Sequence, residues 1–199
     1  NSVNVDFIYG LPYQTLASYE ANLDWIQKHR PDRLALFSYA HVPWIKHHQK
    51  RLPVEEVPEP SEKLQIYLRA QRVLMENGYD QIGMDHFSLP SDSLSIALRD
   101  KTLHRNFMGY STHAHLDMVG LGTSSISFVQ GVFAQNQVKL KPYYTSLDEG
   151  QPTFEKGYAW QDDDGVRSTV IQSLMGRFYV NLRQIEEAWD IDFHITFKH

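Results

Sequence analysis

The first 90 residues alternate between two apolar patterns, and this alternation strongly constrains the fold. Residues 3–8 and 33–39 are short apolar runs of the kind that form strands, and Gly10-Leu11-Pro12 ends the first run. Between them, Leu16 and Leu23 recur with other apolar side chains at helical spacing. A helix between two strands implies parallel strands joined by a right-handed crossover. The sequence therefore predicts an α/β fold whose parallel strands form part of a TIM-like barrel.

The alternation continues to about residue 90 and then breaks down. A second helix is predicted to begin near Ser61 and to end at Gly78, and a third strand should cover residues 79–83. Farther along, residues 116–129 have the pattern of one or two strands interrupted by glycines, and residues 138–149 have the pattern of a helix.

A turn-rich stretch over residues 148–157 separates this region from a last, helical segment. We expect residues 1–150 to form the barrel part with its extension, and residues 151–199 to form a small, mainly helical and incomplete C-terminal domain. Because Asn1 leads directly into a predicted strand, we also expect the chain to continue in a larger protein.

Composition excludes several classes of protein. The 199 residues are 42% hydrophobic, enough for the core of one medium domain or of one domain with an appendage. A formal charge of −5 gives no field that would attract nucleic acid or an anionic membrane. No apolar run approaches the roughly 20 residues that cross a bilayer. We therefore expect a cytoplasmic protein with neither nucleic acid nor a membrane among its partners.

Each of the three predicted strands ends in polar or aromatic side chains, and these are the first candidates for a functional site. They are Asp6, Tyr39, Asp85 and His86. In barrels the chemistry lies at the C-terminal ends of the strands. An aspartate in an apolar strand is also a common structural acceptor for backbone N–H groups, because an unpaired buried carboxylate is costly. Both interpretations stay open at this point.

Metal and phosphate sites receive little support from the sequence. The chain has 10 histidines but no His pair at helical i, i+4 spacing beside a glutamate, and it has no cysteine at all. We therefore expect no metal site in this chain. The segment Gly120–Ser125 lacks the lysine of a phosphate-binding loop, so a tight turn is the preferred interpretation. The histidines considered were His47, His48, His86, His104, His113 and His115.

Five longer strings resemble the oxygen-independent coproporphyrinogen III oxidases, in that family's order and spacing. The Gly-Leu-Pro element is shared by many radical S-adenosylmethionine proteins. The strings over residues 82–87 and 103–107 separate the oxidases from related haem chaperones. The strings are Asn4-Val5-Asp6-Phe7-Ile8-Tyr9-Gly10-Leu11-Pro12, Tyr39-Ala40-His41-Val42-Pro43, Ile82-Gly83-Met84-Asp85-His86-Phe87, Leu103-His104-Arg105-Asn106-Phe107 and Ala134-Gln135-Asn136.

The resemblance implies a radical S-adenosylmethionine barrel and an oxidoreductase of porphyrin and haem biosynthesis. Its substrate would be coproporphyrinogen III, and its cofactors S-adenosylmethionine and a [4Fe–4S] cluster bound through a Cys-x-x-x-Cys-x-x-Cys motif that this chain lacks. A 5′-deoxyadenosyl radical would remove hydrogen from a propionate β-carbon. Loss of CO₂ and one electron at two propionates would then give the two vinyl groups of protoporphyrinogen IX. We expect the full-length protein to be an active monomer and this chain alone to be inactive.

Three residues match S-adenosylmethionine-binding positions of that family, namely Asp6, Ala40 and Ile126. The resemblance implies that Asp6 accepts hydrogen bonds from the ligand, that Ala40 allows close backbone approach and that Ile126 packs on adenine. Candidate pocket residues on weaker grounds are Tyr39, Asp85, His86, Arg105 and Phe107, and no catalytic residue is assigned. The sequence departs from the common family pattern at Met108 and at Ala114-His115.

Two other functions remain open from the sequence. A haem-binding chaperone of the same superfamily would carry haem without decarboxylating a substrate. An unrelated barrel hydrolase would use Asp85 and His86 as its acid and base.

Overall fold

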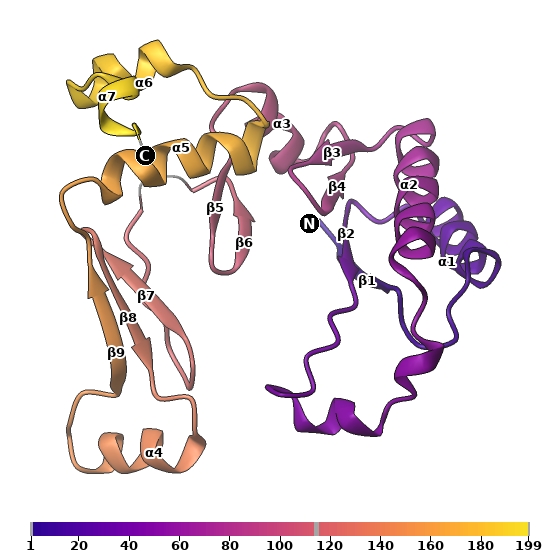
Figure 1. Ribbon diagram of the computed structural model, residues 1–199, viewed down its shortest axis with the longest axis horizontal. Coiled ribbons are helices and arrows are strands. Elements are labelled where there is room, and N and C mark those ends of the chain that lie inside the picture. Colours follow the sequence, from indigo (N-terminus) through magenta and orange to yellow (C-terminus); the bar gives the residue numbers. More distant parts are fainter. Residues whose placement is uncertain (1, 114–115, 199) are drawn as a thin grey trace. The chain divides into compact units, whose positions relative to one another are not determined.

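The computed structural model describes residues 2–113 and 116–198. The chain forms two compact units, Asn1–Lys101 and Thr102–His199, called here the N-terminal and the C-terminal unit. Figure 1 shows their elements along the chain. The division expected near residue 150 does not coincide with the boundary between these units.

The N-terminal unit contains a four-stranded sheet in the order β1-β2-β4-β3. Strands β1 (Asn4–Tyr9) and β2 (Arg33–Ser38) are parallel, as predicted. The predicted third strand, β3 (Asp80–Ile82), does not pair with β2. Instead β4 (His86–Ser88) lies between them, antiparallel to both. The sheet is therefore mixed, and the prediction of purely parallel strands was wrong.

The reason for this difference is a tight turn after β3. Gly83 adopts a φ of 59°, a left-handed conformation that favours glycine, and the chain reverses there. His86 and Phe87, predicted from the sequence to belong to the polar end of the third strand, instead return along the sheet in β4. The N-terminal unit is an α/β structure, but its four-stranded sheet does not by itself establish a barrel.

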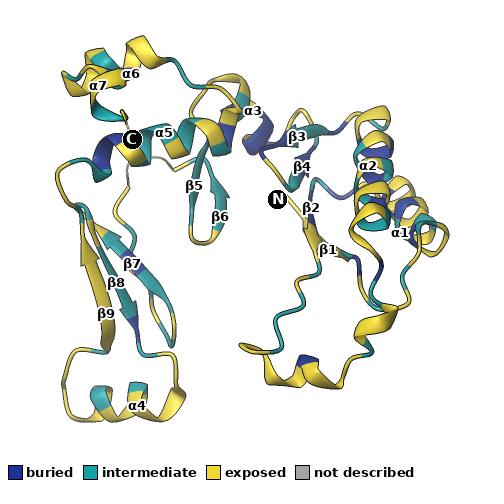
Figure 2. Cartoon of the chain, in the orientation of Figure 1, coloured by how far each residue is buried: buried dark blue, intermediate teal, exposed yellow. Residues whose placement is uncertain are grey.

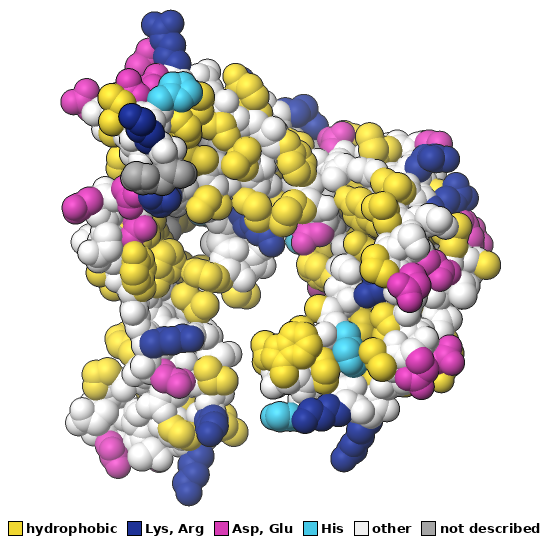
Figure 3. All heavy atoms as spheres, viewed as in Figure 1, with side chains coloured by type: hydrophobic (Ala, Val, Ile, Leu, Met, Phe, Trp, Pro, Cys, Tyr) yellow, Lys and Arg dark blue, Asp and Glu magenta, His cyan; other side chains and the backbone are white. Residues whose placement is uncertain are grey.

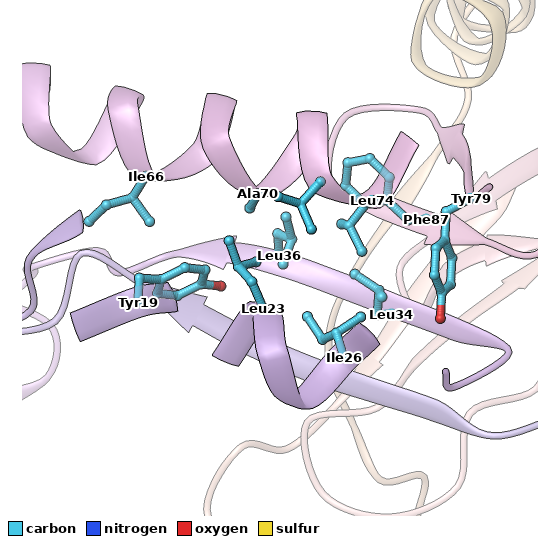
Figure 4. Packing of buried hydrophobic residues seen from close by; sticks show 11 residues of the cluster. Tyr19, Leu23, Ile26, Leu34, Leu36, Ile66, Ala70, Leu74, Tyr79 and Phe87 are labelled. Carbon is cyan, nitrogen blue, oxygen red and sulfur yellow. The ribbon is translucent and has the colours of Figure 1, made fainter. Parts of the chain in front are cut away.

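Two helices cover one face of this sheet. Helix α1 (Leu16–His29) begins at a capping box between Thr15 and Ser18, and α2 (Pro60–Glu76) begins with proline in its first turn. Their buried side chains form one core with β2 and β4, to which each large apolar side chain contributes about 1.5–3 kcal/mol. Figure 4 shows this packing. The core consists of Tyr19, Leu23, Ile26, Leu34, Leu36, Ile66, Ala70, Val73, Leu74, Tyr79 and Phe87.

Three shorter helices complete the N-terminal unit. The 3-10 helices η1 (His47–Arg51) and η2 (Val54–Glu56) lie in the long connection between β2 and α2. This connection is mainly exposed, in contrast to the buried sides of α1 and α2 (Figure 2). Helix α3 (Ser93–Arg99) follows β4, and its N-cap is the carboxylate of Asp92.

The C-terminal unit is built around an antiparallel sheet of β7 (Ile126–Val129), β8 (Val132–Asn136) and β9 (Phe154–Ala159). Strand β9 was missed, because its segment was taken for part of a turn-rich divider. Gly157 allows the close approach of β8, since a Cβ there would lie 2.9 Å from the Phe133 carbonyl oxygen. Residues 151–199 are consequently not a separate helical domain: their first strand completes a sheet that begins before residue 150.

Among the described residues of this unit, the remaining elements are one hairpin and four helices. Strands β5 (His104–Asn106) and β6 (Gly109–Ser111) form the hairpin. The predicted helix over residues 138–149 is confirmed as α4 (Leu140–Asp148). The helices after β9 are α5 (Asp164–Arg177), α6 (Leu182–Trp189) and α7 (Phe193–Thr196). In the part of the chain that the structure describes, no helix has the length and apolarity to cross a bilayer.

Candidate functional site

Asp6 lies on the face of the sheet opposite to α1 and α2. The burial of β1 alternates, so that Asn4, Asp6 and Ile8 are exposed while the residues between them are half-buried. Asp6 is the third residue of a six-residue strand, which corrects the expectation that it lies at the strand's end. Its Oδ1 accepts a hydrogen bond from Asn4 Nδ2 at 2.8 Å. Since the carboxylate is exposed, the alternative role as a buried structural acceptor is not supported.

Asp6 and His86 share this open face with a small residue between them. Asp6 pairs in register with Ala35, and Ala35 pairs with His86. Residues in register on adjacent strands point to the same side of a sheet, about 5 Å apart. Ala35 itself is completely buried, so the carboxylate and the imidazole lie on either side of a covered position of the sheet.

Asp85 holds the His86 ring from the turn between β3 and β4. The Asp85 Oδ1 atom lies 2.6 Å from His86 Nδ1, and because a carboxylate accepts, the imidazole donates through Nδ1. The Phe37 ring meets the His86 ring edge-on at 5.8 Å between centroids. The backbone of Asp85 is also fixed, since Leu36 N donates to the Asp85 carbonyl at 2.7 Å. The two candidates Asp85 and His86 are therefore brought together as one oriented pair.

The C-terminal ends of β1 and β2 are joined by a lysine that sequence reasoning missed. Lys63 Nζ donates to the Tyr39 carbonyl at 3.1 Å and lies 5.7 Å from the centre of the Tyr39 ring. Its aliphatic part packs on Gly10, where a Cβ would lie 2.7 Å from Lys63 Cε. Tyr39 N also donates to the Tyr9 carbonyl at 2.8 Å. The glycine after β1 was the signal in the sequence that something approaches closely there.

Ala40 lies in the loop after β2 and is held by Gln49, a second residue that sequence reasoning missed. Gln49 Nε2 donates to the Ala40 carbonyl at 3.0 Å, and its Oε1 accepts from Val42 N at 2.6 Å. The side chain of Gln49 is buried, with 8% of the residue exposed. A glutamine between histidines and basic residues resembles a surface residue, so the sequence carried no signal for this role.

Ile126 opens β7 in the C-terminal unit, directly after the segment Gly120–Ser125. A Cβ at Gly120 would lie 2.9 Å from the Ile126 carbonyl oxygen, so the two backbones are in close contact. The buried Asn136 Nδ2 reaches the Gly120 carbonyl at 3.2 Å and the Gly122 carbonyl at 2.9 Å. The segment is therefore a turn fixed by Asn136, which confirms the turn interpretation.

Arg105 and Phe107 lie on the hairpin of β5 and β6. Gln172 of α5 accepts from Arg105 N at 2.9 Å and donates to the Arg105 carbonyl at 2.7 Å, so the helix holds the hairpin by both backbone groups. The Arg105 guanidinium lies 4.8 Å from the centre of the Tyr110 ring. Phe107 is exposed near the turn and meets Phe133 edge-on at 5.4 Å between centroids.

Two separate groups of candidates thus emerge, one in each unit. Asp6, Tyr39, Ala40, Asp85 and His86 belong to the N-terminal unit, and Ile126, Arg105 and Phe107 belong to the C-terminal unit. Within residues 2–113 and 116–198, no three His, Cys, Asp or Glu side chains gather as a metal site would require. The candidates Ala114 and His115 lie outside the described residues.

Comparison with solved structures gives the class of protein. The coproporphyrinogen III oxidase from Escherichia coli, described as a radical SAM enzyme, superposes with a TM-score of 0.95 at 42% identity. The match covers 99% of this chain and 45% of that one. The chain therefore has the fold of part of a radical S-adenosylmethionine enzyme.

Comparison with curated sequences narrows this class. The chain is 44% identical over 198 residues to the oxygen-independent coproporphyrinogen III oxidase of Synechocystis sp., covering 100% of this chain and 42% of that protein. It is 44% identical to the Pseudomonas aeruginosa oxidase, with 98% and 43% coverage, and 41% identical to the Thermostichus vulcanus oxidase, with 98% and 61% coverage. No family model matches. The chain is thus homologous to the oxygen-independent coproporphyrinogen III oxidases, and it spans less than half the length of the first two relatives.

Proposed function

We propose that this chain is part of an oxygen-independent coproporphyrinogen III oxidase, which converts two propionates of coproporphyrinogen III to vinyl groups and so forms protoporphyrinogen IX. Each conversion removes one hydrogen atom from a β-carbon, releases CO₂ and passes one electron to an acceptor. The observation that carries this proposal is the 44% identity to an enzyme of that name over all of the chain.

The proposed role of the N-terminal unit is to bind S-adenosylmethionine on the open face of its sheet. Asp6 offers an exposed carboxylate that accepts charge-assisted hydrogen bonds, which suits the ribose hydroxyls and the ammonium group of that ligand. Ala40, exposed at the end of β2, presents no side chain beyond a methyl group to obstruct a ligand. These properties fit the cofactor, and Ile126 remains a proposed apolar contact for adenine on the family resemblance alone.

The iron–sulfur cluster would be bound elsewhere. None of the 199 residues is cysteine, so this chain offers no thiolate ligand for a [4Fe–4S] cluster. When bound, the cluster and S-adenosylmethionine would provide the radical that removes the β-hydrogen. The residues of this chain would position the cofactor and the substrate, and the isolated chain should be inactive.

The test is an assay of the complete protein that carries this chain, with its cluster reconstituted without oxygen. Formation of protoporphyrinogen IX and release of two CO₂ per coproporphyrinogen III, both dependent on S-adenosylmethionine, are expected. A protein that transfers haem but releases no CO₂ would instead be a haem chaperone. Turnover of a hydrolysable substrate by cluster-free protein, lost in Asp85→Asn, would favour the hydrolase.

A further inference from the structure

The loop that contains η1 concentrates positive charge in a chain that is acidic overall. The chain has 24 Asp and Glu against 19 Lys and Arg, yet residues 41–52 contain no acidic residue. The same stretch carries Lys46, Lys50 and Arg51, and acidic residues resume only at Glu55. Figure 3 shows basic, histidine and apolar side chains together over this connection.

The geometry of η1 directs these charges to solvent. In a 3-10 helix, side chains three residues apart lie above one another. The side chains of His47 and Lys50 therefore lie above one another and form one column along the helix. Those of His48 and Arg51 form a second column. The side chain of Gln49 lies on the third side of the helix, which is buried. All four residues of the two columns are exposed. The hydrogen bonds of Gln49 to the loop after β2 fix the orientation of both columns.

Two large apolar side chains are exposed immediately before this helix. Trp44 is 69% exposed and Ile45 is 65% exposed. An exposed indole on the same loop as guanidinium and ammonium groups offers a flat apolar surface together with charge-assisted donors for carboxylates. This combination suits a ligand that carries flat, apolar pyrrole rings and several carboxylates at its edge.

We propose that Trp44, Lys50 and Arg51, with Lys46 and His47 beside them, bind the non-reacting propionates and the pyrrole face of the tetrapyrrole substrate. This inference rests on the proposed function and names the part of the chain that recognises that substrate. Trp44 follows Ala40, the proposed cofactor contact, by four residues, so its Cα lies within about 14 Å of the Ala40 Cα. A substrate bound at this loop is thus close to the strand end where the cofactor is expected.

A small ligand fits this surface better than a protein partner does. A stable protein interface buries about 800 Å² on each partner and takes about 20–30 residues from each side. The exposed basic side chains and Trp44 all lie within residues 44–51, a stretch of eight residues. Several carboxylates on one small molecule can each reach a different cation within this span.

The test measures equilibrium binding of coproporphyrin III, the stable oxidised tetracarboxylate, to the intact protein by fluorescence titration. The double variant Lys50→Ala with Arg51→Ala should raise Kd about tenfold at low salt, because two exposed ion pairs with the carboxylates are lost. The difference should nearly vanish at about 1 M salt, where the Debye length is about 3 Å. Trp44→Ala should also weaken binding, and Trp44→Phe should largely restore it.

A matched control removes the same charge elsewhere on the N-terminal unit. Lys28 and Arg72 are exposed on α1 and α2, and Lys28→Ala with Arg72→Ala should leave Kd unchanged. In turnover assays the loop variants should raise KM with kcat preserved. An unchanged Kd, an equal loss in the control, or a fall in kcat alone, which would indicate docking of a protein electron acceptor, would overturn the inference. Wild-type protein that binds coproporphyrin III without converting coproporphyrinogen III would contradict the proposed function while leaving this site in place.

Discussion

Gln49 and Ala40 are joined by a side-chain to backbone hydrogen bond of 3.0 Å across nine residues. Through this bond and the one from Val42 N, a single buried amide holds the loop after β2 in place. The loop carries both the proposed cofactor contact and the basic surface of η1, so Gln49 connects the two parts of the candidate site.

Replacement of Gln49 by alanine should destabilise the N-terminal unit. It removes the hydrogen bonds to the Ala40 carbonyl and from Val42 N–H, each of which contributes about 0.5–1.5 kcal/mol. Denaturant unfolding of the complete protein should show this loss. Gln27→Ala, at an exposed position of α1, should change the free energy of unfolding by less than about 0.5 kcal/mol. Equal effects of the two substitutions would contradict the role given to Gln49.

Asp6→Asn in the complete protein should weaken S-adenosylmethionine binding. The substitution keeps the size of the side chain but removes its charge, and a hydrogen bond to a charged group contributes about 1.5–3 kcal/mol, equivalent to a tenfold or greater rise in Kd. Calorimetry measures the affinity, and the visible absorption of the cluster should not change. Asp24→Asn, on the exposed side of α1, is the matched control. An unchanged affinity for Asp6→Asn would exclude this carboxylate from the site.

Tyr19→Phe should stabilise the protein, most clearly in alkali. The Tyr19 hydroxyl is buried and has no hydrogen-bond partner in the described part of the chain. Burial, together with the charge of Tyr9, raises the pKa of Tyr19 to about 12. The pKa of Tyr19 is higher in the folded protein than in the unfolded chain. The free energy of unfolding is therefore at its full value below about pH 10, and it falls as the pH rises through the pKa of Tyr19 in the folded protein.

At neutral pH, the free energy of unfolding of the Tyr19→Phe variant should equal that of the wild type or be higher by up to about 1 kcal/mol. The advantage should grow between about pH 10 and 12. Unfolding curves at several pH values measure this, with the exposed Tyr13→Phe as a control. A variant that is less stable than the wild type at neutral pH would indicate that the hydroxyl has a bound partner.

Asp92→Asn should destabilise the protein at neutral pH and lose its effect in acid. Burial raises the pKa of Asp92, but hydrogen bonds from Arg33, Leu94 N and Ser2 outweigh it, so the pKa is lowered overall. The lowered pKa stabilises the folded protein at pH values above the pKa that Asp92 has in the unfolded chain. This stabilisation disappears as the pH falls through the pKa of Asp92 in the folded protein. Asparagine retains the N-cap, so the difference reports the charge and its bonds with Arg33.

Unfolding of Asp92→Asn should show a deficit of about 2 kcal/mol near neutral pH. The deficit should shrink as the pH falls below the ordinary aspartate pKa of about 3.9 and through the lowered pKa of Asp92 in the folded protein. Asp24→Asn again provides a charge-matched control. A deficit that does not change with pH would show that the packing of the side chain, rather than its charge, stabilises α3.

Several elements of this protein were predictable from local pattern. The capping box of α1, the proline and glycine that bound α2, and the apolar runs of β1 and β2 all lie within a few residues of the structure that they specify. The family strings are equally local, which is why they indicate homology to the oxidases without reference to any tertiary contact.

Strand pairing was less predictable, because it depends on residues far apart in the chain. The segments of β4 and β9 are too short or too polar to show a clear period, and each becomes a strand only through the partner that it meets. The same holds for Lys63, Gln49 and Asn136, whose sequence neighbours suggest ordinary polar positions.

Periodicity and family strings therefore determined α1, α2, β1, β2 and β3 and which enzymes the chain resembles, since these depend on residues close in sequence. Tertiary structure alone decided the order β1-β2-β4-β3, the orientation of the Asp85 and His86 pair and the fixing of Ala40 by Gln49. Each of these depends on a hydrogen bond or a packing contact made only when the chain folds.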